Sequence, residues 1–374
     1  MDPSILLCSF KPCDQAVVSV PWTSFPYVAV NERIIGAKTP VNPEYVDEGR
    51  YKQLTSMKLA YDKVDSKTFS RARDACNPFE KIGNGGYSNR AAMKLANIDA
   101  VTGICTFCKP FDMFNPSTDY PLVYADVAAG PGGFTQHIQS RYPLSTGYGM
   151  TLKGDLDFDP NFIDFESFTS FYGSHGDGDL YKHSLEFQKM IIEGPGGVDL
   201  LMADGGIEMD QDQEYHSSNL LICQAFLGMS CVREGGNFVL KVFDTVNKLS
   251  GDVLYCLSMC YDQVVMFKPV TSRPANSERY FLCKNRLEQD DTDLLTLFQR
   301  LLFQVKKGVF FESIITRPSK DFIRWLEQGN EENLQRQLEY NGYIQQYLSG
   351  DKDIVNTIPQ YMIHKFEMLW HLPL

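Results

Sequence analysis

Several features that mark special classes of protein are missing from this sequence of 374 residues. It contains no run of 18 apolar residues, which argues against a membrane-spanning helix. The first residues, MDPSILLCSFKPCDQ, lack the basic start of a signal peptide, so we expect an intracellular chain whose 10 cysteines are reduced thiols. Hydrophobic residues make up 43% and charged residues 22%, proportions that exclude the disordered and fibrous classes.

Positive charge is scarce in the chain as a whole but is concentrated in one segment. The formal net charge of −12 argues against a protein that covers nucleic acid with its entire surface. Between Arg50 and Lys94, however, there are ten basic residues and only four acidic ones, a local excess of six positive charges. Two interpretations stay open for this segment: an ordinary solvated helix surface, or a landing surface for a polyanion such as RNA.

The order of the apolar segments predicts an α/β fold with a mainly parallel sheet. Repeats and low-complexity tracts are absent from the sequence. Short apolar runs predict strands at residues 122–128, 146–151, 198–203, 237–243, 264–267 and 280–283. Helical patterns alternate with these runs at residues 88–98, 132–141, 219–232 and 253–261. From about residue 287 the pattern is helical, so we expect a strand–helix core with a helical C-terminal tail.

A glycine-rich turn follows the first predicted strand. Its sequence, DVAAGPGGF at residues 126–134, leads into a helix whose N-terminal N–H groups and neighbouring glycines suit close contact with a ligand. The turn matches neither the GxGxxG dinucleotide motif nor a phosphate-binding loop. A tight strand–helix turn without a ligand explains it equally well. The acidic segment from Gly176 to Leu180 has two similar explanations, contact with an adenine or ribose edge and a simple acidic turn.

Four ionisable residues are expected at strand or helix ends around one crevice. Lys94 lies in a helix of small and apolar residues, and Asp204 ends an apolar strand. Lys241 interrupts the strand FVLKVF, and Glu278 precedes the last predicted strand. Such charges cost on the order of several kcal/mol to bury unless they are paired, so a stabilising ion network is one explanation. The other is catalysis, because burial beside a like charge would lower the pKa of one lysine, and a neutral lysine can take a proton from a hydroxyl group.

These four residues resemble the Lys-Asp-Lys-Glu set of FtsJ-like 2′-O-ribose methyltransferases, and AAGPGGF resembles the S-adenosylmethionine loop of that family. The strings NRAAMKLANID, GYGMTLKG, LLMADGG and FKPVTSRPANSERYFLCK are similar to those of the cap-specific mRNA 2′-O-methyltransferases, which make the cap-1 structure. The resemblance covers about Arg71 to Lys284. Bacterial ribosomal members carry a Met-Ala-Pro turn after the catalytic aspartate, where this chain has Gly205-Gly206.

The resemblance implies a fold, a domain division and a cofactor. The fold would be a Rossmann-like, S-adenosylmethionine-dependent methyltransferase sheet over residues 71–286, with an N-terminal extension at 1–70 and a helical region at 287–374. S-adenosylmethionine would be bound by Asn89, by the loop residues Ala128, Ala129, Gly130, Pro131, Gly132, Gly133 and Phe134, and by Asp179 and Leu180.

The resemblance also implies the role of each residue of the tetrad. Lys241 would be the general base for the 2′-OH of the first transcribed nucleotide. Lys94 and Asp204 would position that hydroxyl and the methyl sulfonium, and Glu278 would orient one of the lysines. The RNA contacts, to the cap, its triphosphate or the first nucleotides, would come from Arg73, Ser272, Arg273 and Asn276. No metal is expected, because the leaving group is already a sulfonium cation.

Two alternative functions stay open, one with a different RNA substrate and one without catalysis. The tetrad would equally serve 2′-O-methylation of ribosomal or transfer RNA, and a non-catalytic subunit could bind RNA and S-adenosylmethionine. The expected partner is the 5′ end of capped mRNA, not a membrane, and the tail would be a helical buttress or a surface for other capping or transcription machinery. A cellular enzyme would act in the nucleus and a viral one in the cytoplasm. A zinc site at Cys105 and Cys108 is disfavoured, since no convincing second cysteine pair follows.

Overall fold

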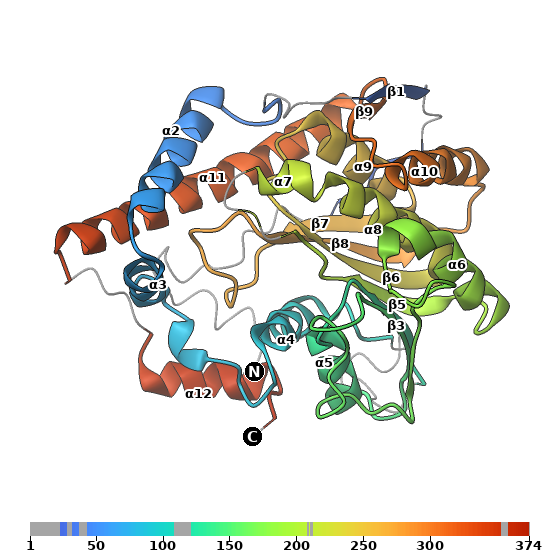
Figure 1. Cartoon of the computed structure of the whole chain (residues 1–374), viewed down its shortest axis with the longest axis horizontal. Coiled ribbons are helices and arrows are strands. Elements are labelled where there is room, and N and C mark those ends of the chain that lie inside the picture. The colour runs from blue at the N-terminus through green and yellow to red at the C-terminus, as the bar shows by residue number, and fades with distance from the viewer. Residues whose placement is uncertain are drawn as a thin grey trace.

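A computed structural model describes residues 23–27, 32–36, 43–107, 121–207, 209, 212–352 and 358–373. Its centre is a seven-stranded sheet, in which the strands lie in the order β4-β3-β2-β5-β6-β8-β7 (Figure 1). The strands are β2 (Val123–Val127), β3 (Thr146–Met150), β4 (Phe168–Ser170), β5 (Val198–Ala203), β6 (Val232–Val242), β7 (Tyr261–Phe267) and β8 (Arg279–Arg286). The α/β fold class predicted from the sequence is therefore confirmed.

The direction of the strands sets where a ligand can bind. The pairs from β4 to β6 are parallel, whereas β8 is antiparallel to both β6 and β7. From β2 the chain first builds outward through β3 and β4, and then returns to the other side of β2 with β5. The junction between β2 and β5 is thus a topological switch point, and ligands of such sheets bind at the carboxyl ends of the strands beside it.

Helices cover both faces of the sheet because side chains alternate along each strand. On one face Tyr124 and Leu200 pack with α4 (Arg90–Thr102) and α5 (Gly133–Arg141). On the other face, Ala125 and Leu201 belong to a larger core with four helices: α6 (Leu180–Glu193), α8 (Ser218–Cys231), α9 (Lys248–Ser258) and α10 (Thr292–Val305). Figure 1 shows the two layers on opposite sides of the strands.

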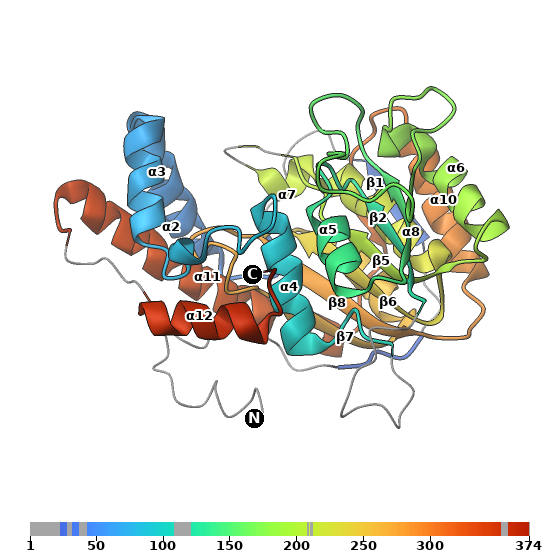
Figure 2. The ribbon, with the colours of Figure 1, turned by 90° about the horizontal axis from the view of Figure 1, so that it is seen from below.

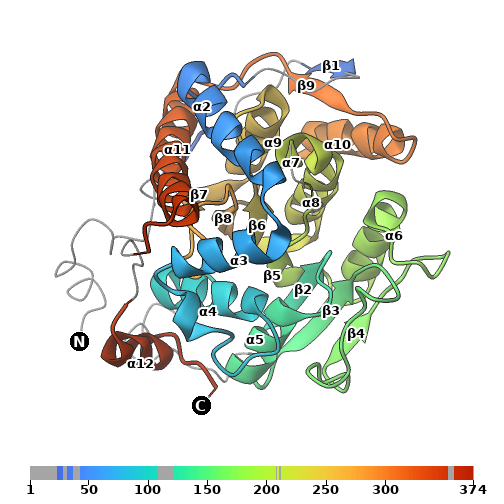
Figure 3. The ribbon, with the colours of Figure 1, turned by 60° about the vertical axis from the view of Figure 1, so that its left-hand side comes forward.

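Helices from the two ends of the chain pack side by side. Near the N-terminus are α2 (Glu48–Leu59), the short η2 (Ala60–Lys63), α3 (Ser66–Ala75) and η3 (Glu80–Ile82). The 30-residue helix α11 (Lys320–Ser349) lies along α2 and α3 (Figure 3). Helix α12 (Gln360–Leu369) lies near α4 (Figure 2) and shares an apolar cluster with it through Ile363 and Met93.

The tail differs in part from the predicted helical region. Besides α10, α11 and α12 it contains the strand β9 (Phe311–Ile315), which pairs antiparallel with β1 (Glu32–Gly36). The Asp252 carboxylate of α9 anchors β9 by accepting hydrogen bonds from the Ser313 hydroxyl (2.6 Å) and the Ile314 N–H (2.9 Å). Helix α10 shares the core of the sheet, and the domain boundaries at residues 70 and 286 stay a prediction.

Two further observations concern the membrane-spanning helices and the cysteine pairs that were considered from the sequence. No helix in the described ranges is both long and apolar enough to cross a lipid bilayer. The cysteines in these ranges are unpaired: Cys76, Cys105, Cys223, Cys231, Cys256, Cys260 and Cys283. Cys108, the other half of the disfavoured zinc pair, lies outside the described residues.

Candidate active site

The register of the sheet places three of the predicted residues in one row. Val127 of β2 pairs with Ala203 of β5, and Ala203 pairs with Leu240 of β6. The next residue of each strand, Ala128, Asp204 and Lys241, therefore lies at the same edge. This edge is the carboxyl end of the parallel strands, at the switch point.

The fourth residue reaches the same edge because β8 runs in the opposite direction. Tyr280 of β8 pairs with Lys241, and Arg279 pairs with Val242. Glu278, which directly precedes β8, thus lies beside the end of β6. Lys94 comes from the middle of α4, the helix that covers this part of the sheet.

The four side chains form two ion pairs. The Lys94 Nζ lies 2.8 Å from the Glu278 Oε2, and the Lys241 Nζ lies 3.3 Å from the Asp204 Oδ1. All four side chains are at most 17% exposed, so neither pair is an ordinary surface salt bridge. The structure therefore brings together the complete set that the sequence predicted.

The charges of the first pair are fixed by their neighbours. Burial alone would lower the pKa of Lys94, but the Glu278 and Asp204 carboxylates outweigh it and raise this pKa above its ordinary value. Burial would raise the pKa of Glu278, but the charges of Lys94 and Lys241 outweigh it and hold this pKa well below its ordinary value. Lys94 is thus not the lysine with a lowered pKa that the sequence predicted, and it is held in its charged form.

Two hydroxyl groups complete the coordination of the carboxylates, and neither was predicted. The Tyr280 hydroxyl donates to the Asp204 Oδ1 at 2.7 Å, and the Ser272 hydroxyl donates to the Glu278 Oε1 at 2.7 Å. Ser272 had been expected to contact RNA; here it orients the carboxylate that binds Lys94. Tyr280 is placed here by the pairing of β8 with β6, which sets it opposite Lys241.

The glycine loop packs tightly against the start of α4. The Asn89 Oδ1 caps α4 by accepting from the N–H groups of Ala91 (2.9 Å) and Ala92 (3.4 Å). A Cβ atom added at Gly133 would lie 2.3 Å from this same Oδ1, so only glycine fits there. Gly132 adopts a φ of 102°, in the left-handed region that favours glycine.

These features fit a polar ligand at the head of the loop. The N-cap of α5 is Gly132, which supplies no capping side chain, so the helix N-terminus is left to other acceptors. Ala128, Gly130 and Pro131 are not fully buried, whereas Phe134 packs inside the core against Tyr280 at 6.0 Å between ring centroids. Asn89, the loop backbone and the neighbouring Asp204 are thus the groups that would surround a bound S-adenosylmethionine.

Thr151 joins the glycine loop to the acidic segment, a role that no local sequence pattern indicated. Its Oγ1 accepts a hydrogen bond from the Gly130 N–H at 3.0 Å. A Cβ atom at Gly178 would lie 1.7 Å from the Thr151 carbonyl oxygen, so the two backbones are in direct contact. Asp179 is thereby brought to the end of β3, where it caps α6 through the Tyr181 N–H (3.0 Å), and Leu180 begins that helix as a buried residue.

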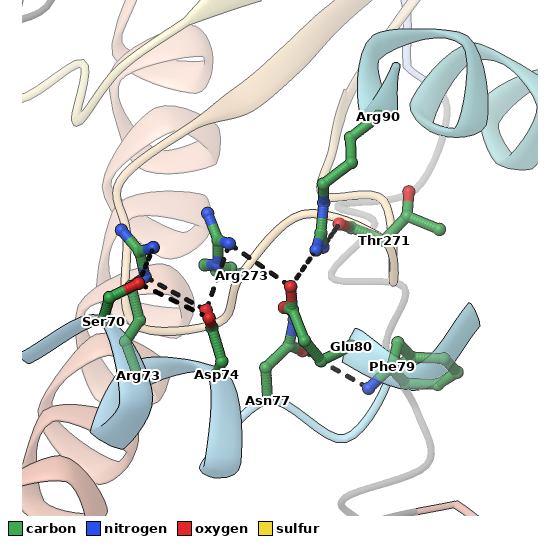
Figure 4. A network of polar contacts seen from close by, with 9 residues as sticks. All are labelled: Ser70, Arg73, Asp74, Asn77, Phe79, Glu80, Arg90, Thr271 and Arg273. Carbon is green, nitrogen blue, oxygen red and sulfur yellow. Dashed lines mark hydrogen bonds and ion pairs between the residues drawn. The ribbon is translucent and has the colours of Figure 1, made fainter. Parts of the chain in front are cut away.

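The predicted RNA contacts Arg73 and Arg273 lie in a network of ion pairs (Figure 4). The Arg273 Nη2 lies 3.2 Å from the Asp74 Oδ1 and 3.3 Å from the Glu80 Oε1. Arg73 contacts the same Asp74 oxygen at 3.4 Å. Arg90 forms an ion pair with Glu80 and donates to the Thr271 carbonyl at 3.0 Å. Three arginines against two carboxylates leave this partly exposed cluster with one excess positive charge.

Asn276, the remaining predicted RNA contact, is bound by a buried lysine. The Lys268 Nζ donates to the Asn276 carbonyl (2.7 Å), to the Asn276 Oδ1 (3.0 Å) and to the Glu278 carbonyl (2.9 Å). Burial lowers the pKa of Lys268 well below its ordinary value. The amide of Asn276 thus helps to hold the segment that leads into Glu278. No group of three or more His, Cys, Asp or Glu side chains within the described part of the chain is placed to bind a metal ion.

A sheet of this order, with a glycine loop at its switch point, defines the Rossmann-like methyltransferase class. The chain belongs to the FtsJ-like methyltransferase family, whose model matches residues 87–286, more than half of the sequence. Methyltransferases of this family use S-adenosylmethionine.

Curated relatives point to one branch of the family by name. Cap-specific mRNA (nucleoside-2′-O-)-methyltransferase 1 of Bos taurus is 39% identical over 268 residues, which cover 64% of this chain and 31% of the relative. The protein of the same name from Xenopus laevis is 37% identical over 282 residues, 69% of this chain and 33% of the relative. The 1A protein of Caenorhabditis briggsae is 31% identical over 379 residues, 91% of this chain and 42% of the relative. The chain spans less than half the length of these relatives.

Two solved structures share a distant resemblance with the chain. A ribosomal RNA methyltransferase from Plasmodium falciparum has a TM-score of 0.37 and 17% identity, covering 54% of this chain and 100% of the other. Human methyltransferase-like protein 13, in complex with SAH, has a TM-score of 0.35 and 15% identity, covering 58% of this chain and 92% of the other. Similarity at this level carries no argument about substrate.

Proposed function

We propose that this chain methylates the ribose 2′-OH of the first transcribed nucleotide of capped mRNA and so converts cap-0 to cap-1. The observation that supports this most directly is the pairing of Lys94 with Glu278 and of Lys241 with Asp204, next to the glycine loop at the switch point. The names of the relatives supply the substrate class. S-adenosylmethionine, when bound, supplies an activated methyl group on a sulfonium.

In this proposal each residue of the tetrad has a separate task. Lys241 would accept the proton of the 2′-OH as that oxygen takes the methyl group, and the sulfonium would leave as a neutral thioether. Lys94 stays protonated in its pair with Glu278 and offers a fixed positive charge to the ribose oxygen. Asp204, held by the Tyr280 hydroxyl, keeps Lys241 in place. Catalysis then consists mainly of positioning and of one proton transfer.

A polar pocket beside the tetrad supports recognition of the methylated guanine. It has a volume of about 200 Å³, and its wall includes Asp244, Asn247 and Ser277, which lie within six residues of Lys241 or Glu278 in the sequence. Tyr51 and Tyr215 supply aromatic rings, and Asp244 supplies a carboxylate. Carboxylates suit the N–H donors of a guanine edge, and aromatic rings suit the positive charge of an N7-methylated base.

The positive surface near the pocket supports binding of the transcript. The segment with ten basic residues, from Arg50 to Lys94, forms α2, α3 and the start of α4, and the arginine network of Figure 4 joins it to the segment before Glu278. Phosphates would gain from the excess positive charge of that network. We place the enzyme in the nucleus, where mRNA is capped, and leave other capping machinery as a proposed partner of the C-terminal helices.

Transfer of a labelled methyl group tests this function. Wild-type protein is expected to label N7-methylguanine-capped RNA in a nuclease-resistant cap dinucleotide, and not uncapped RNA. Lys241→Met should reduce turnover by about 10²- to 10⁴-fold, the usual contribution of a general base, while cofactor affinity stays within a few-fold. Lys189→Met, at an exposed position of α6, is the matched control.

Three outcomes would contradict parts of the proposal. Label on uncapped or structured RNA would move the assignment to ribosomal or transfer RNA methylation. Cofactor binding without transfer to any RNA would favour a non-catalytic subunit. Loss of cofactor binding in Lys241→Met, with the Lys189→Met control intact, would mean that Lys241 is structural.

A further inference from the structure

Helix α11 carries an unusual set of buried amides on one face. Asn330, Asn333, Gln337 and Asn341 are each at most 2% exposed. Their spacing of three, four and four residues places them in one row along the helix. The row lies outside residues 87–286, which the family model covers.

The amides at the first two positions bind segments next to the tetrad. Asn330 accepts hydrogen bonds from Arg279 (2.7 Å) and from the Thr245 hydroxyl (2.8 Å), and it donates to the Thr245 carbonyl (2.9 Å). Arg279 directly follows Glu278, and Thr245 lies four residues after Lys241. Asn333 makes a longer contact to the Ser277 carbonyl at 3.4 Å.

Gln337 lies behind the wall of the proposed cap pocket. Its Nε2 donates to the Asp244 Oδ1 at 3.1 Å, and its Oε1 accepts from the Lys58 Nζ at 2.8 Å. Asp244 and Lys58 both line the pocket, one from the segment after β6 and the other from α2. Gln337 therefore joins two walls whose contact residues, Lys58 and Asp244, are 186 residues apart in the sequence, and the Tyr51 hydroxyl joins the same walls by donating to the Asp244 Oδ2 at 3.3 Å.

Asn341 extends the row to the segment before Glu278. Its Nδ2 donates to the Ala275 carbonyl at 3.0 Å, and its own carbonyl accepts from the Tyr61 hydroxyl at 3.0 Å. Apolar side chains would pack this helix just as well. Burying an amide is unfavourable unless hydrogen bonds compensate for the water that it loses, so the partners of the four amides show what the row does. Here the partners lie in four places: Tyr45, residues 244–245, residues 275–279, and the N-terminal helices.

We propose that α11 is a positioning element of the active site, in which Gln337 holds the two walls of the pocket that receives the capped end of the RNA. This inference rests on the proposed function, because it concerns the binding of that substrate. Gln337 touches neither the ribose nor the methyl group in this scheme. It acts through Asp244 and Lys58, which contact the bound nucleotide.

Two substitutions at Gln337 and one control separate positioning from folding. Gln337→Leu removes both hydrogen bonds, and Gln337→Glu keeps the size and the acceptor for Lys58 but faces Asp244 with a second carboxylate. Gln328→Leu removes an amide from the exposed face of the same helix, where its contact is to Glu332. Each protein is assayed for KM and kcat on capped RNA, for the Kd of the cap analogue N7-methyl-GpppA and of S-adenosylmethionine, and for Tm.

Both Gln337 variants are expected to raise the KM for capped RNA and the Kd of the cap analogue by about tenfold, as for loss of a hydrogen bond to a charged group. Cofactor Kd should stay within twofold, and Tm within a few degrees of Gln328→Leu. Equal values of KM and cap-analogue Kd in Gln337 and Gln328 variants would overturn the inference. So would a parallel loss of cofactor binding and Tm in both Gln337 variants.

The proposed function and this inference fail in different ways. Absence of methyl transfer by the wild-type protein contradicts the function, whereas the cap-analogue Kd still tests the role of Gln337 without turnover. Wild-type protein that does not bind the cap analogue overturns both. An active wild type with unaltered Gln337 variants overturns the inference alone.

Discussion

The two lysines of the site differ in the partner that each one has. Lys94 lies 2.8 Å from Glu278, whose other oxygen is held by the Ser272 hydroxyl, so its charge is matched at close range. The Lys241 Nζ lies 3.3 Å from the Asp204 Oδ1, and the same oxygen accepts a hydrogen bond from the Tyr280 hydroxyl. Because the carboxylates around Lys94 raise its pKa and hold it in its charged form, Lys241 is the lysine of the tetrad that we assign as the base.

Tyr280→Phe tests the support of Asp204. The change removes one hydroxyl but keeps the ring that packs against Phe134, so the core should be preserved. Without the 2.7 Å hydrogen bond, Asp204 is free to rotate and Lys241 loses its fixed position. We expect kcat to fall about tenfold while cofactor Kd and Tm change little. Steady-state methyl transfer and thermal melting measure this, and an unchanged kcat would show that Asp204 needs no such support.

Single residues of the site were predictable where they break a local pattern. Lys241 and Asp204 stood out because a charge at the end of an apolar strand is costly. Thr151 and Tyr280 did not stand out, because a threonine and a tyrosine are ordinary strand residues. Their contacts to Gly130 and Asp204 depend on which strands become neighbours, and that is decided far along the chain.

At the scale of elements, the cofactor loop depends on how closely α5 approaches α4. At Gly133 an added Cβ would lie 2.3 Å from the Asn89 Oδ1 and 3.0 Å from the Ala92 nitrogen. Neither of these atoms is the flexible end of a long side chain. The helix start that carries Asn89 and the loop that follows β2 are therefore held as one unit.

Gly133→Ala should separate these two helix starts. We expect loss of the Asn89 cap, a lower Tm by several degrees, and cofactor Kd raised by about tenfold or more, since capping and close packing each contribute on the order of 1 kcal/mol or more. Gly342→Ala is the control: it adds a methyl group to a helical glycine with no atom within 4 Å, so it should be neutral or stabilising. Calorimetric titration with S-adenosylhomocysteine measures the cofactor Kd of both variants, and thermal melting measures their Tm. Equal affinity in the two variants would contradict the tight junction.

Elements were predicted well where the pattern is local. The strands at 122–128, 146–151 and 198–203 match β2, β3 and β5 to within a residue or two. Strand β9 was missed because it pairs with β1, some 280 residues earlier, and nothing in its five residues indicates this partner. Helix α11 was predicted as part of a helical tail, but its buried face mixes apolar side chains with four amides, and hydrophobic spacing gave no indication of what the amides contact.

At the scale of the whole molecule, folding takes several carboxyl groups out of water without an opposing charge. Burial raises the pKa of Asp126 to about 8, that of Glu214 to about 7 and that of Asp252 to about 6. They lie in β2, α7 (Gln213–His216) and α9. Asp126 accepts hydrogen bonds from Thr135 at 2.8 and 3.1 Å, but the nearby Asp204 raises its pKa further.

These shifts predict how stability depends on pH. A carboxyl group whose pKa is raised by folding keeps its proton in the native state where the unfolded chain has released it. The free energy of unfolding should therefore fall as the pH rises from about 4, the ordinary carboxyl pKa, to about 8. Glu278, whose pKa is lowered, acts in the opposite sense only near or below pH 4, outside this window. Lys268, whose pKa is lowered by burial, also acts in the opposite sense, between its lowered pKa and the ordinary lysine value of about 10.4. Urea denaturation at pH 5.5, 7 and 8.5 measures the slope.

Asp126→Asn assigns the largest share of this slope to one group. The amide oxygen can still accept from Thr135, and no proton is released at high pH, so the variant should lose less stability than the wild type between pH 5.5 and 8.5. Asp155→Asn, at an exposed position, should keep the wild-type slope. An unchanged slope in Asp126→Asn would mean that Asp126 is already ionised in the native protein over this pH range. Because Asp126 lies two residues before the glycine loop, that result would also place a negative charge directly beneath the proposed cofactor site.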